Sequence, residues 1–245
     1  MTSHQSPVIP FNTPLRGTRH GFFVTGTDTG AGKTLVTCAL LHAFAARGLR
    51  VVGMKPVAAG AQWHADGLRN EDVEQILAAG NVPASRQLVN PYCFEPPIAP
   101  HIAARDAGVE IDLQHIELAY GGLSQLADMV IVEGVGGFCV PLNARETTAD
   151  LAQRLDLPVL LVVGMRLGCL NHALLTAHAV RARGLELVGW VANHVDPGMT
   201  HAEANIEALT ERLAVPPVAR IGYSFSPNPR SIAASLDIDR LGFDG

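Results

Sequence analysis

The sequence predicts a single α/β domain with a mostly parallel central sheet and helices on both faces. Short apolar runs alternate with helical stretches along the chain, as in parallel sheets crossed by helices. The apolar runs are almost unbroken, which is typical of strands buried on both faces. The length of 245 residues fits one large domain, and no repeat or linker divides it. We therefore expect a flexible tail over 1–19, which is rich in Pro, Thr and Ser, and one domain over 20–245.

The elements can be placed in order along the chain. The first helix should bury Leu35, Ala39 and Leu40 and end at Gly48. Only one short helix is expected in the irregular section from Ala59 to Pro100, and long irregular segments are more often functional than idle. The expected strands cover 21–25, 51–54, 129–132, 158–163, 187–191 and 217–221. The expected helices cover 33–47, 71–79, 112–126, 169–183 and 201–213.

Composition excludes several classes of protein. Hydrophobic residues make up 48% and charged residues 17%, as in ordinary globular proteins. The net charge of −5 argues against nonspecific nucleic-acid binding, which relies on Lys and Arg. No apolar run approaches the roughly 18 residues that span a membrane. The four cysteines contain no C-x-x-C pair, which fits a reducing cytoplasm, and we expect Cys38 and Cys139 to be buried.

The strongest motif is the glycine-rich segment Gly26-Thr-Asp-Thr-Gly-Ala-Gly-Lys-Thr34, between the first strand and the first helix. Its glycines let backbone N–H groups surround phosphate oxygens at a helix N-terminus. Lys33 can reach the β- and γ-phosphates, and the Thr34 hydroxyl can bind Mg²⁺. This context predicts a P-loop NTPase-like fold. Five residues separate Gly26 from Gly32, one more than in the strict P-loop pattern, and Asp28 stands where partitioning ATPases carry a second lysine.

Acidic residues that could hold the metal lie elsewhere in the chain. Glu133 ends a buried strand and precedes a glycine loop, at the sheet edge where ligands bind in open α/β folds. The alternative is a surface acid that merely ends a strand. Asp72 lies in the first turn of the short helix, where acids are common because of the helix dipole. Spacing alone does not favour Asp72 over Glu71.

Several motifs, in order and with matched spacing, resemble the dethiobiotin synthetase family from about Phe22 to Ile221. They are Thr25-Gly-Thr-Asp-Thr-Gly-Ala-Gly-Lys-Thr34, Lys55-Pro-Val-Ala58, Gly67-Leu-Arg-Asn-Glu-Asp72, Asn90-Pro-Tyr92, Pro100-His101, Val132-Glu-Gly-Val-Gly-Gly137, Leu167-Gly-Cys-Leu-Asn-His172 and Gly189-Trp-Val-Ala-Asn193. The resemblance implies a reaction of 7,8-diaminononanoate, CO2 and MgATP that gives dethiobiotin, ADP and phosphate. It proceeds through a carbamate and a carbamic–phosphoric anhydride.

The resemblance also implies the site residues. Lys33, Lys55 and Thr29 would be catalytic, because positive charge must gather between the carbamate and the γ-phosphate. Thr34, Asp72 and Glu133 would hold Mg²⁺. The nucleotide would be bound by Gly30, Ala31, Gly32, Lys33, Thr34, Leu35, Asp72, Glu133, Gly134, Val135, Gly136, Asn193, His194, Gly222 and Tyr223, with Asn193 at the adenine edge. The diamine would be bound by Lys55, Ala59, Cys169, Leu170 and Asn171, the last three across the interface of a homodimer.

The chain departs from the family pattern at three positions. Ala59 replaces a hydroxyl residue, Gly30 replaces an acid, and the segment Ile221-Gly222-Tyr223 lacks the proline that is usual beside the base. Two other functions are alternatives. An amide-forming synthetase of the cobyrinate type usually carries a glutaminase domain, for which this chain is too short. A nonenzymatic nucleotide-sensing module could lose Lys55 and the segment 168–171, and both are present.

Overall fold

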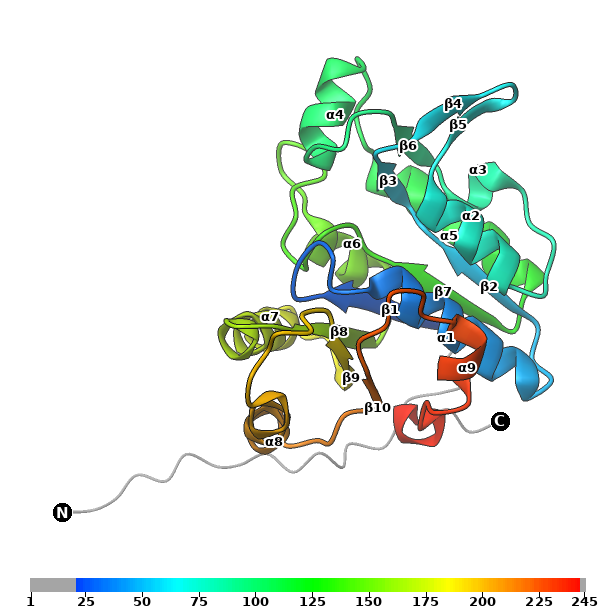
Figure 1. Ribbon diagram of the computed structural model, residues 1–245. Coiled ribbons are helices and arrows are strands. Elements are labelled where there is room, and N and C mark those ends of the chain that lie inside the picture. The colour runs from blue at the N-terminus through cyan, green and yellow to red at the C-terminus, as the bar shows by residue number, and fades with distance from the viewer. Residues whose placement is uncertain (1–20, 243–245) are drawn as a thin grey trace.

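The computed structural model describes residues 21–242, so the expected tail over 1–19 lies outside the described residues. Six parallel strands form the central sheet in the order β10-β9-β8-β1-β7-β2 (Figure 1). The strands are β1 (Gly21–Gly26), β2 (Val51–Met54), β7 (Met129–Glu133), β8 (Val159–Met165), β9 (Leu187–His194) and β10 (Ala219–Ile221). Every residue of β1, β2, β7 and β8 is buried, as the unbroken apolar runs predict. The predicted parallel α/β fold is confirmed.

Helices cover both faces of this sheet. From β1 the chain first crosses to the edge strand β2, and from β2 it returns through β7, β8 and β9 to the other edge strand, β10. Because crossovers between parallel strands are right-handed, the connections that run in these two directions lie on opposite faces of the sheet. On one face α1 (Lys33–Ala46) packs against α9 (Pro229–Ala233) and against α2 (Glu71–Ala79) beside the edge strand. The other face carries α5 (Leu113–Leu126), α6 (Thr148–Leu155), α7 (Cys169–Ala182) and α8 (Ala202–Leu213) (Figure 1).

Helix α1 is more deeply buried than a surface helix. Its buried residues include Val36, Leu40, Leu41 and Phe44, whereas Leu35, which we expected on the buried face, is only partly covered. Helix α1 is deeply buried because α2 and α9 also pack against it. This burial holds the N-terminus of α1, and with it the phosphate loop, in a fixed place.

The middle section contains more structure than the sequence indicates. Strand β3 (Val57–Ala59) pairs with β6 (Tyr92–Phe94), and β4 (Gln62–His64) forms a hairpin with β5 (Gly67–Arg69). Two short helices follow, α3 (Arg86–Val89) and α4 (Pro100–Asp106). These elements form a layer above the carboxyl end of the sheet (Figure 1).

Three further expectations need correction. Helix α6 was not expected, although the Asp150 carboxylate accepts hydrogen bonds from the backbone N–H and the hydroxyl of Thr147 at its start. The short helices α9 and η1 (Ile238–Leu241) follow β10, beyond the last element that the sequence indicates. Cys139 is exposed rather than buried, because Phe138 occupies the buried position beside it, whereas Cys38 is buried as expected.

The parallel sheet brings the ends of its strands to one edge. The phosphate loop follows β1, Lys55 follows β2, Glu133 ends β7, and Asn193 lies at the end of β9. Ligands of open α/β sheets bind at this edge. Within the described residues, no helix is long and apolar enough to cross a membrane.

Candidate active site

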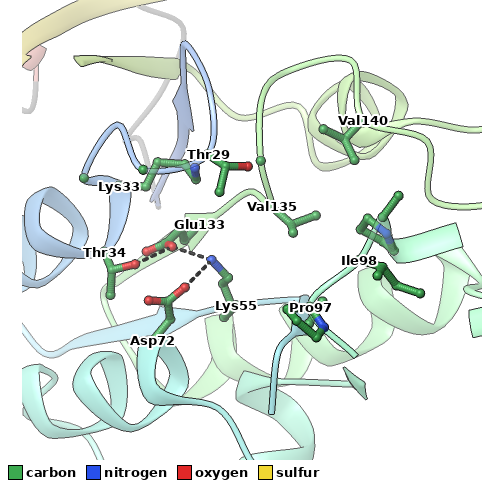
Figure 2. Close-up of a pocket in the computed structure, with 16 residues that line it drawn as sticks. Thr29, Lys33, Thr34, Lys55, Asp72, Pro97, Ile98, Glu133, Val135 and Val140 are labelled. Carbon is green, nitrogen blue, oxygen red and sulfur yellow. Dashed lines mark hydrogen bonds and ion pairs between the residues drawn. The ribbon is translucent and has the colours of Figure 1, made fainter. Parts of the chain in front are cut away.

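A cavity of about 760 Å³ opens at the carboxyl edge of the sheet. On one side lie the phosphate loop and the start of α1, and on the other the layer formed by the middle section (Figure 2). Its lining residues are Thr29, Gly30, Gly32, Lys33, Thr34, Lys55, Ala59, Asp72, Pro97, Ile98, Ala99, Pro100, Glu133, Val135, Gly136 and Val140. The cavity therefore joins all three residues expected to hold Mg²⁺, most of those expected to bind phosphate, and two of the five expected to bind the diamine, Lys55 and Ala59.

The phosphate loop has a conformation that requires glycine at two positions. Gly30 and Gly32 have φ angles of 76° and 90°, in the left-handed region that side chains disfavour. A Cβ on Gly32 would also lie 2.1 Å from Nδ2 of Asn193. That amide donates a 2.8 Å hydrogen bond to the Ala31 carbonyl, so the end of β9 supports the loop. The loop is thus fixed by glycine geometry and by a side chain from a distant strand.

Lys33 lies at the base of the loop with 7% of its surface exposed. Its ammonium donates a 3.2 Å hydrogen bond to the Asp28 carbonyl. Burial, followed by repulsion from the nearby Lys55 ammonium, lowers the pKa of Lys33 to about 8. A bound polyphosphate would favour its charged form.

Lys55 is the centre of a buried ionic cluster. Its Nζ lies 2.5 Å from Oε1 of Glu133, 3.1 Å from Oδ2 of Asp72 and 3.5 Å from the Gly134 carbonyl oxygen. The Thr34 hydroxyl donates a 2.9 Å hydrogen bond to the same Oε1 of Glu133. Figure 2 shows these four side chains converging on one wall of the cavity. Segments up to 99 residues apart in sequence thus meet at this point.

Contacts within the cluster favour the charged forms of Lys55 and Asp72. Burial alone would lower the pKa of Lys55, but the carboxylates of Glu133 and Asp72 outweigh it and raise that pKa. Burial alone would raise the pKa of Asp72, yet the Lys55 ammonium, aided by Thr34 and Lys33, lowers it. The Lys55 ammonium thus forms ion pairs with both Asp72 and Glu133 at the centre of the cluster.

Two buried asparagines set the positions of Lys55 and Asp72. Asn90 donates hydrogen bonds of 2.6 Å to the Lys55 carbonyl and 2.9 Å to the Tyr92 carbonyl. Asn70 begins α2, where its Oδ1 accepts from the Asp72 N–H at 3.1 Å, and its Nδ2 donates to the Ala59 carbonyl at 3.1 Å. Both asparagines are 7% exposed. They lie in the motifs 67–72 and 90–92, but the sequence alone assigned them no role.

The acidic residues fit a magnesium ion. Oε2 of Glu133 is fully buried and has no hydrogen-bond partner among the described residues, so it is free to bind a cation. With the Thr34 hydroxyl and the Asp72 carboxylate it offers hard oxygen ligands. Within 21–242 no group of three or more His, Cys, Asp or Glu side chains could hold a metal by itself. Mg²⁺ commonly binds through one or two carboxylates and substrate phosphates, which agrees with this set.

The remaining predicted residues lie in three places. Three residues are next to lining residues in the sequence but do not line the cavity: Ala31 in the loop, Leu35 in α1 and Gly134 just after β7. Asn193 and His194 end β9, which is two strands from β1 in the sheet. Gly222 and Tyr223 follow β10, which is three strands from β1. The third place is the start of α7, which carries Cys169, Leu170 and Asn171. Those three residues do not line the cavity of the described chain.

Two features of the site were not predicted from the sequence. Pro97, Ile98 and Val140 supply an apolar part of the cavity wall (Figure 2). The proline-rich run at 96–100 was the one sequence signal that could have indicated an ordered loop here. Arg166, just beyond β8, forms a 2.6 Å ion pair with Asp28 of the phosphate loop. No spacing rule links these two residues, which are 138 positions apart.

Comparison with known proteins agrees with the fold and finds close relatives of the chain. The model of an AAA domain family matches residues 20–227. The ATP-dependent dethiobiotin synthetase BioD of Nitrosospira multiformis is 57% identical over 92% of this chain and 98% of its own. The protein of the same name from Aromatoleum aromaticum is 54% identical over 88% of this chain and 96% of its own. That from Janthinobacterium sp. (strain Marseille) is 49% identical over 89% of this chain and 94% of its own.

Solved structures with little sequence similarity share the fold. The cell division protein MinD of Aquifex aeolicus is 16% identical, with a TM-score of 0.57 over 92% of this chain and 98% of its own. A ParA family ATPase from Chlorobium tepidum is 12% identical, with a TM-score of 0.52 over 93% and 94%. At this identity the likeness shows the P-loop fold alone.

Proposed function

The chain belongs to the ATP-dependent dethiobiotin synthetase family, and from that premise we propose how its cavity carries out the reaction. It is an ATP-dependent ligase that forms dethiobiotin in biotin biosynthesis. The observation that carries the mechanism is the meeting of Lys33, Thr34, Lys55, Asp72 and Glu133 at one cavity. A phosphate loop and a second lysine there suit a reaction between two anions.

The proposed substrates are 7,8-diaminononanoate, CO2 and ATP. One amine adds to CO2 and loses a proton, which gives a carbamate. A carbamate oxygen attacks the γ-phosphorus, and the bond from phosphorus to the β–γ bridging oxygen breaks to release ADP. The second amine then attacks the carbonyl of the anhydride, and phosphate leaves as the urea ring closes and the amine loses a proton.

Lys33 and Lys55 would offset the charge of the approaching anions. Their ammonium groups lie close enough for each to affect the other, and both border the cavity. Preorganised positive charge of this kind is usually the largest contribution to such catalysis. Thr29, whose N–H is hydrogen-bonded to Asp28 at 2.7 Å, presents its hydroxyl at the cavity rim beside the phosphate loop. We assign it to orientation of the reacting groups.

The metal and the nucleotide occupy neighbouring parts of the proposed site. Thr34, Asp72 and Glu133 would hold Mg²⁺, which when bound supplies positive charge to the phosphates. The backbone N–H groups from Gly30 to Leu35 would bind the phosphate oxygens at the N-terminus of α1. Gly134, Val135 and Gly136 would border the nucleotide on the side of β7.

The base would lie toward the ends of β9 and β10. Ile221 pairs with Asn193 in the sheet, so Gly222 and Tyr223 lie next to Asn193 and His194. The Asn193 amide already donates to Ala31, so its Oδ1 is the atom that we propose for the base. The aromatic Tyr223, 41% exposed, is placed to contact a flat ring.

The distal carboxylate of the diamine requires a second group of residues. We propose that Cys169, Leu170 and Asn171, at the start of α7, supply it across the interface of a homodimer. Gly168 precedes the helix with a φ of 94°, and the side chain of Leu167 beside it is 96% exposed. A partner copy that covers Leu167 would bring the α7 N-terminus to the cavity.

Mixing two inactive variants tests the shared site. In Lys55→Gln the cavity lysine is lost, and in Asn171→Glu a negative charge opposes the substrate carboxylate. If each site uses Lys55 of one protomer and Asn171 of the other, half of the dimers in an equal mixture have one intact site, which restores about a quarter of the wild-type activity. A mixture that stays inactive, or a monomer in sedimentation, would exclude the shared site.

We also propose the cytoplasm as the compartment. All four cysteines are free, which suits a reducing environment.

Isotope transfer tests the proposed anhydride. With bicarbonate labelled by ¹³C and ¹⁸O, the carbonyl of dethiobiotin should gain ¹³C, and one ¹⁸O should pass to the released phosphate. Phosphate that lacks ¹⁸O while the product carries ¹³C would contradict attack by the carbamate oxygen. A parallel reaction in ¹⁸O-labelled water, with unlabelled bicarbonate and a short incubation, measures any phosphate that arises by hydrolysis of ATP instead.

A further inference from the structure

We propose that the Lys55 ammonium is the resident counter-ion of the Asp72–Glu133 pair, so that a divalent cation binds these carboxylates tightly only together with a nucleotide. This inference rests on the proposed function, because it concerns the same metal site. It goes further in giving Lys55 a second role, which is to exclude free divalent cations from the empty site.

The geometry places Lys55 where it competes with a metal. The hydrogen bonds of its Nζ within the described chain go to oxygens, and the two closest belong to the residues expected to bind Mg²⁺. A metal ion bound to the free Oε2 of Glu133 and to Oδ2 of Asp72 would still lie within a few ångströms of the ammonium, because Lys55 contacts the other oxygen of the same Glu133 carboxylate. Figure 2 shows Lys55 between the two carboxylates, with the Thr34 hydroxyl on the other side of Glu133.

Charge balance makes the competition strong. The two carboxylates carry two negative charges, which the ammonium groups of Lys55 and Lys33 already offset. A divalent cation that entered alone would place four positive charges against two negative ones in a largely buried cluster, where like charges repel strongly. Lys55 is 4% exposed and Glu133 is fully buried, so solvent screens the repulsion at these two residues little, whereas the Asp72 side chain is 42% exposed.

A nucleotide changes this balance. Its phosphates bring several negative charges to the loop that borders Lys33 and Thr34, so the divalent cation and both ammonium groups can be held together. Lys55 can then turn from the carboxylates toward the cavity on its flexible side chain. Its charge becomes available to the second anion only after the metal–nucleotide complex has bound.

Binding of Mn²⁺, measured by electron paramagnetic resonance without nucleotide, tests the inference. Lys55→Gln removes the charge but keeps a hydrogen-bond donor for Glu133. We expect this variant to bind Mn²⁺ about tenfold or more tightly than the wild-type protein, because the carboxylates lose their counter-ion. Lys55→Arg should keep the weak binding. Arg154→Gln removes a cation paired with Glu146 and Glu117 away from the cavity instead, and it should leave Mn²⁺ binding unchanged.

The location of any gained affinity is tested by a double variant. Lys55→Gln combined with Glu133→Gln should lose the gain. Unchanged or weaker Mn²⁺ binding by Lys55→Gln would overturn the inference, and so would a gain that persists in the double variant. Thermal unfolding of each variant shows whether it is folded at the temperature of the titration.

The wild-type protein gives a second, independent test. Mn²⁺ should bind much more tightly with ADP than without it. Equal binding in the two conditions would overturn the counter-ion role even if Lys55→Gln does not fold. If Mn²⁺ fails to bind even with ADP, the metal site of the proposed function is wrong, which is a different outcome.

Discussion

Nζ of Lys55 lies 2.5 Å from Oε1 of Glu133, although 78 residues separate them in the sequence. The contact joins the ends of β2 and β7, which are neighbours in the sheet. It fixes a positive charge beside the phosphate loop and makes Lys55 part of the cavity wall rather than a solvated surface lysine. The first prediction follows from this position.

Lys55→Gln should lower kcat for dethiobiotin formation about 100-fold to 1000-fold, as removal of one preorganised charge typically does. Initial rates with saturating substrates measure this effect. The control is Arg154→Gln, which breaks exposed ion pairs with Glu146 and Glu117 on the outside of α6 and should leave kcat unchanged. A variant at Lys55 with near-normal kcat would remove this lysine from the mechanism.

Asn90→Ala should reduce activity through the position of Lys55. The change removes donors to two carbonyls in a buried region and should cost about 1–3 kcal/mol of unfolding free energy. Because small misplacements of a catalytic group are costly, kcat should fall as much as about 100-fold while nucleotide affinity changes little.

Asn81→Ala is the matched control for Asn90. Asn81 accepts from the Val51 N–H at 2.7 Å and donates to the Leu49 carbonyl at 2.8 Å, at the opposite end of β2. Its loss should lower stability and leave kcat near normal. Equal losses of kcat in the two variants would show that Asn90 serves the fold and not Lys55.

Gly32→Ala should disrupt the phosphate loop, because the backbone there has a φ of 90° and a Cβ would lie 2.1 Å from the Asn193 amide. We expect nucleotide affinity to fall by about tenfold or more. Gly30 also has a positive φ, but a Cβ added there would meet no atom within 4 Å. Gly30→Ala should therefore cost only about 1–2 kcal/mol through backbone strain. Titration calorimetry with ADP compares the two, and equal affinities would contradict the role of the Gly32–Asn193 contact.

Nucleotide affinity should depend on pH through Lys33. In the free protein the pKa of Lys33 is about 8, and bound phosphates should raise it. Below pH 8 the ammonium is present in both states, so affinity is flat. Above pH 8 binding must take up a proton, and affinity should fall up to about tenfold per pH unit until the pKa of the complex is reached.

Calorimetry in buffers of different ionisation enthalpy detects this proton uptake. The control is Lys33→Arg, whose guanidinium stays charged throughout and should give a flat profile over the same range. A wild-type profile that is also flat between pH 8 and 9 would contradict the lowered pKa.

Much of the architecture was predictable from local sequence. The runs at 129–133 and 159–165 are apolar enough to identify buried strands, and the loop at 26–34 combines glycines with Lys33 and Thr34 in a recognised order. The middle section was not predictable in the same way. Its strands of three residues, such as β3 and β6, are stabilised by pairing with each other across 35 positions rather than by their own periodicity.

The site shows the same limit. Glu133 could be proposed from its place at the end of a strand, whereas Asp72 could not be separated from Glu71 by spacing. The tertiary structure separates them, because Asn70 caps α2 through the Asp72 N–H and the Asp72 carboxylate contacts Lys55. Such a choice depends on tertiary contacts, and only the resemblance to the family favoured Asp72 in advance.

Phosphate release from MgATP with bicarbonate, with 7,8-diaminononanoate added or omitted, tests the proposed reaction most directly. We predict that release depends on the diamine and that an equal amount of dethiobiotin appears in the mass spectrum. Nucleotide binding without diamine-dependent release would contradict the proposed reaction, and a nucleotide-sensing role would then take its place.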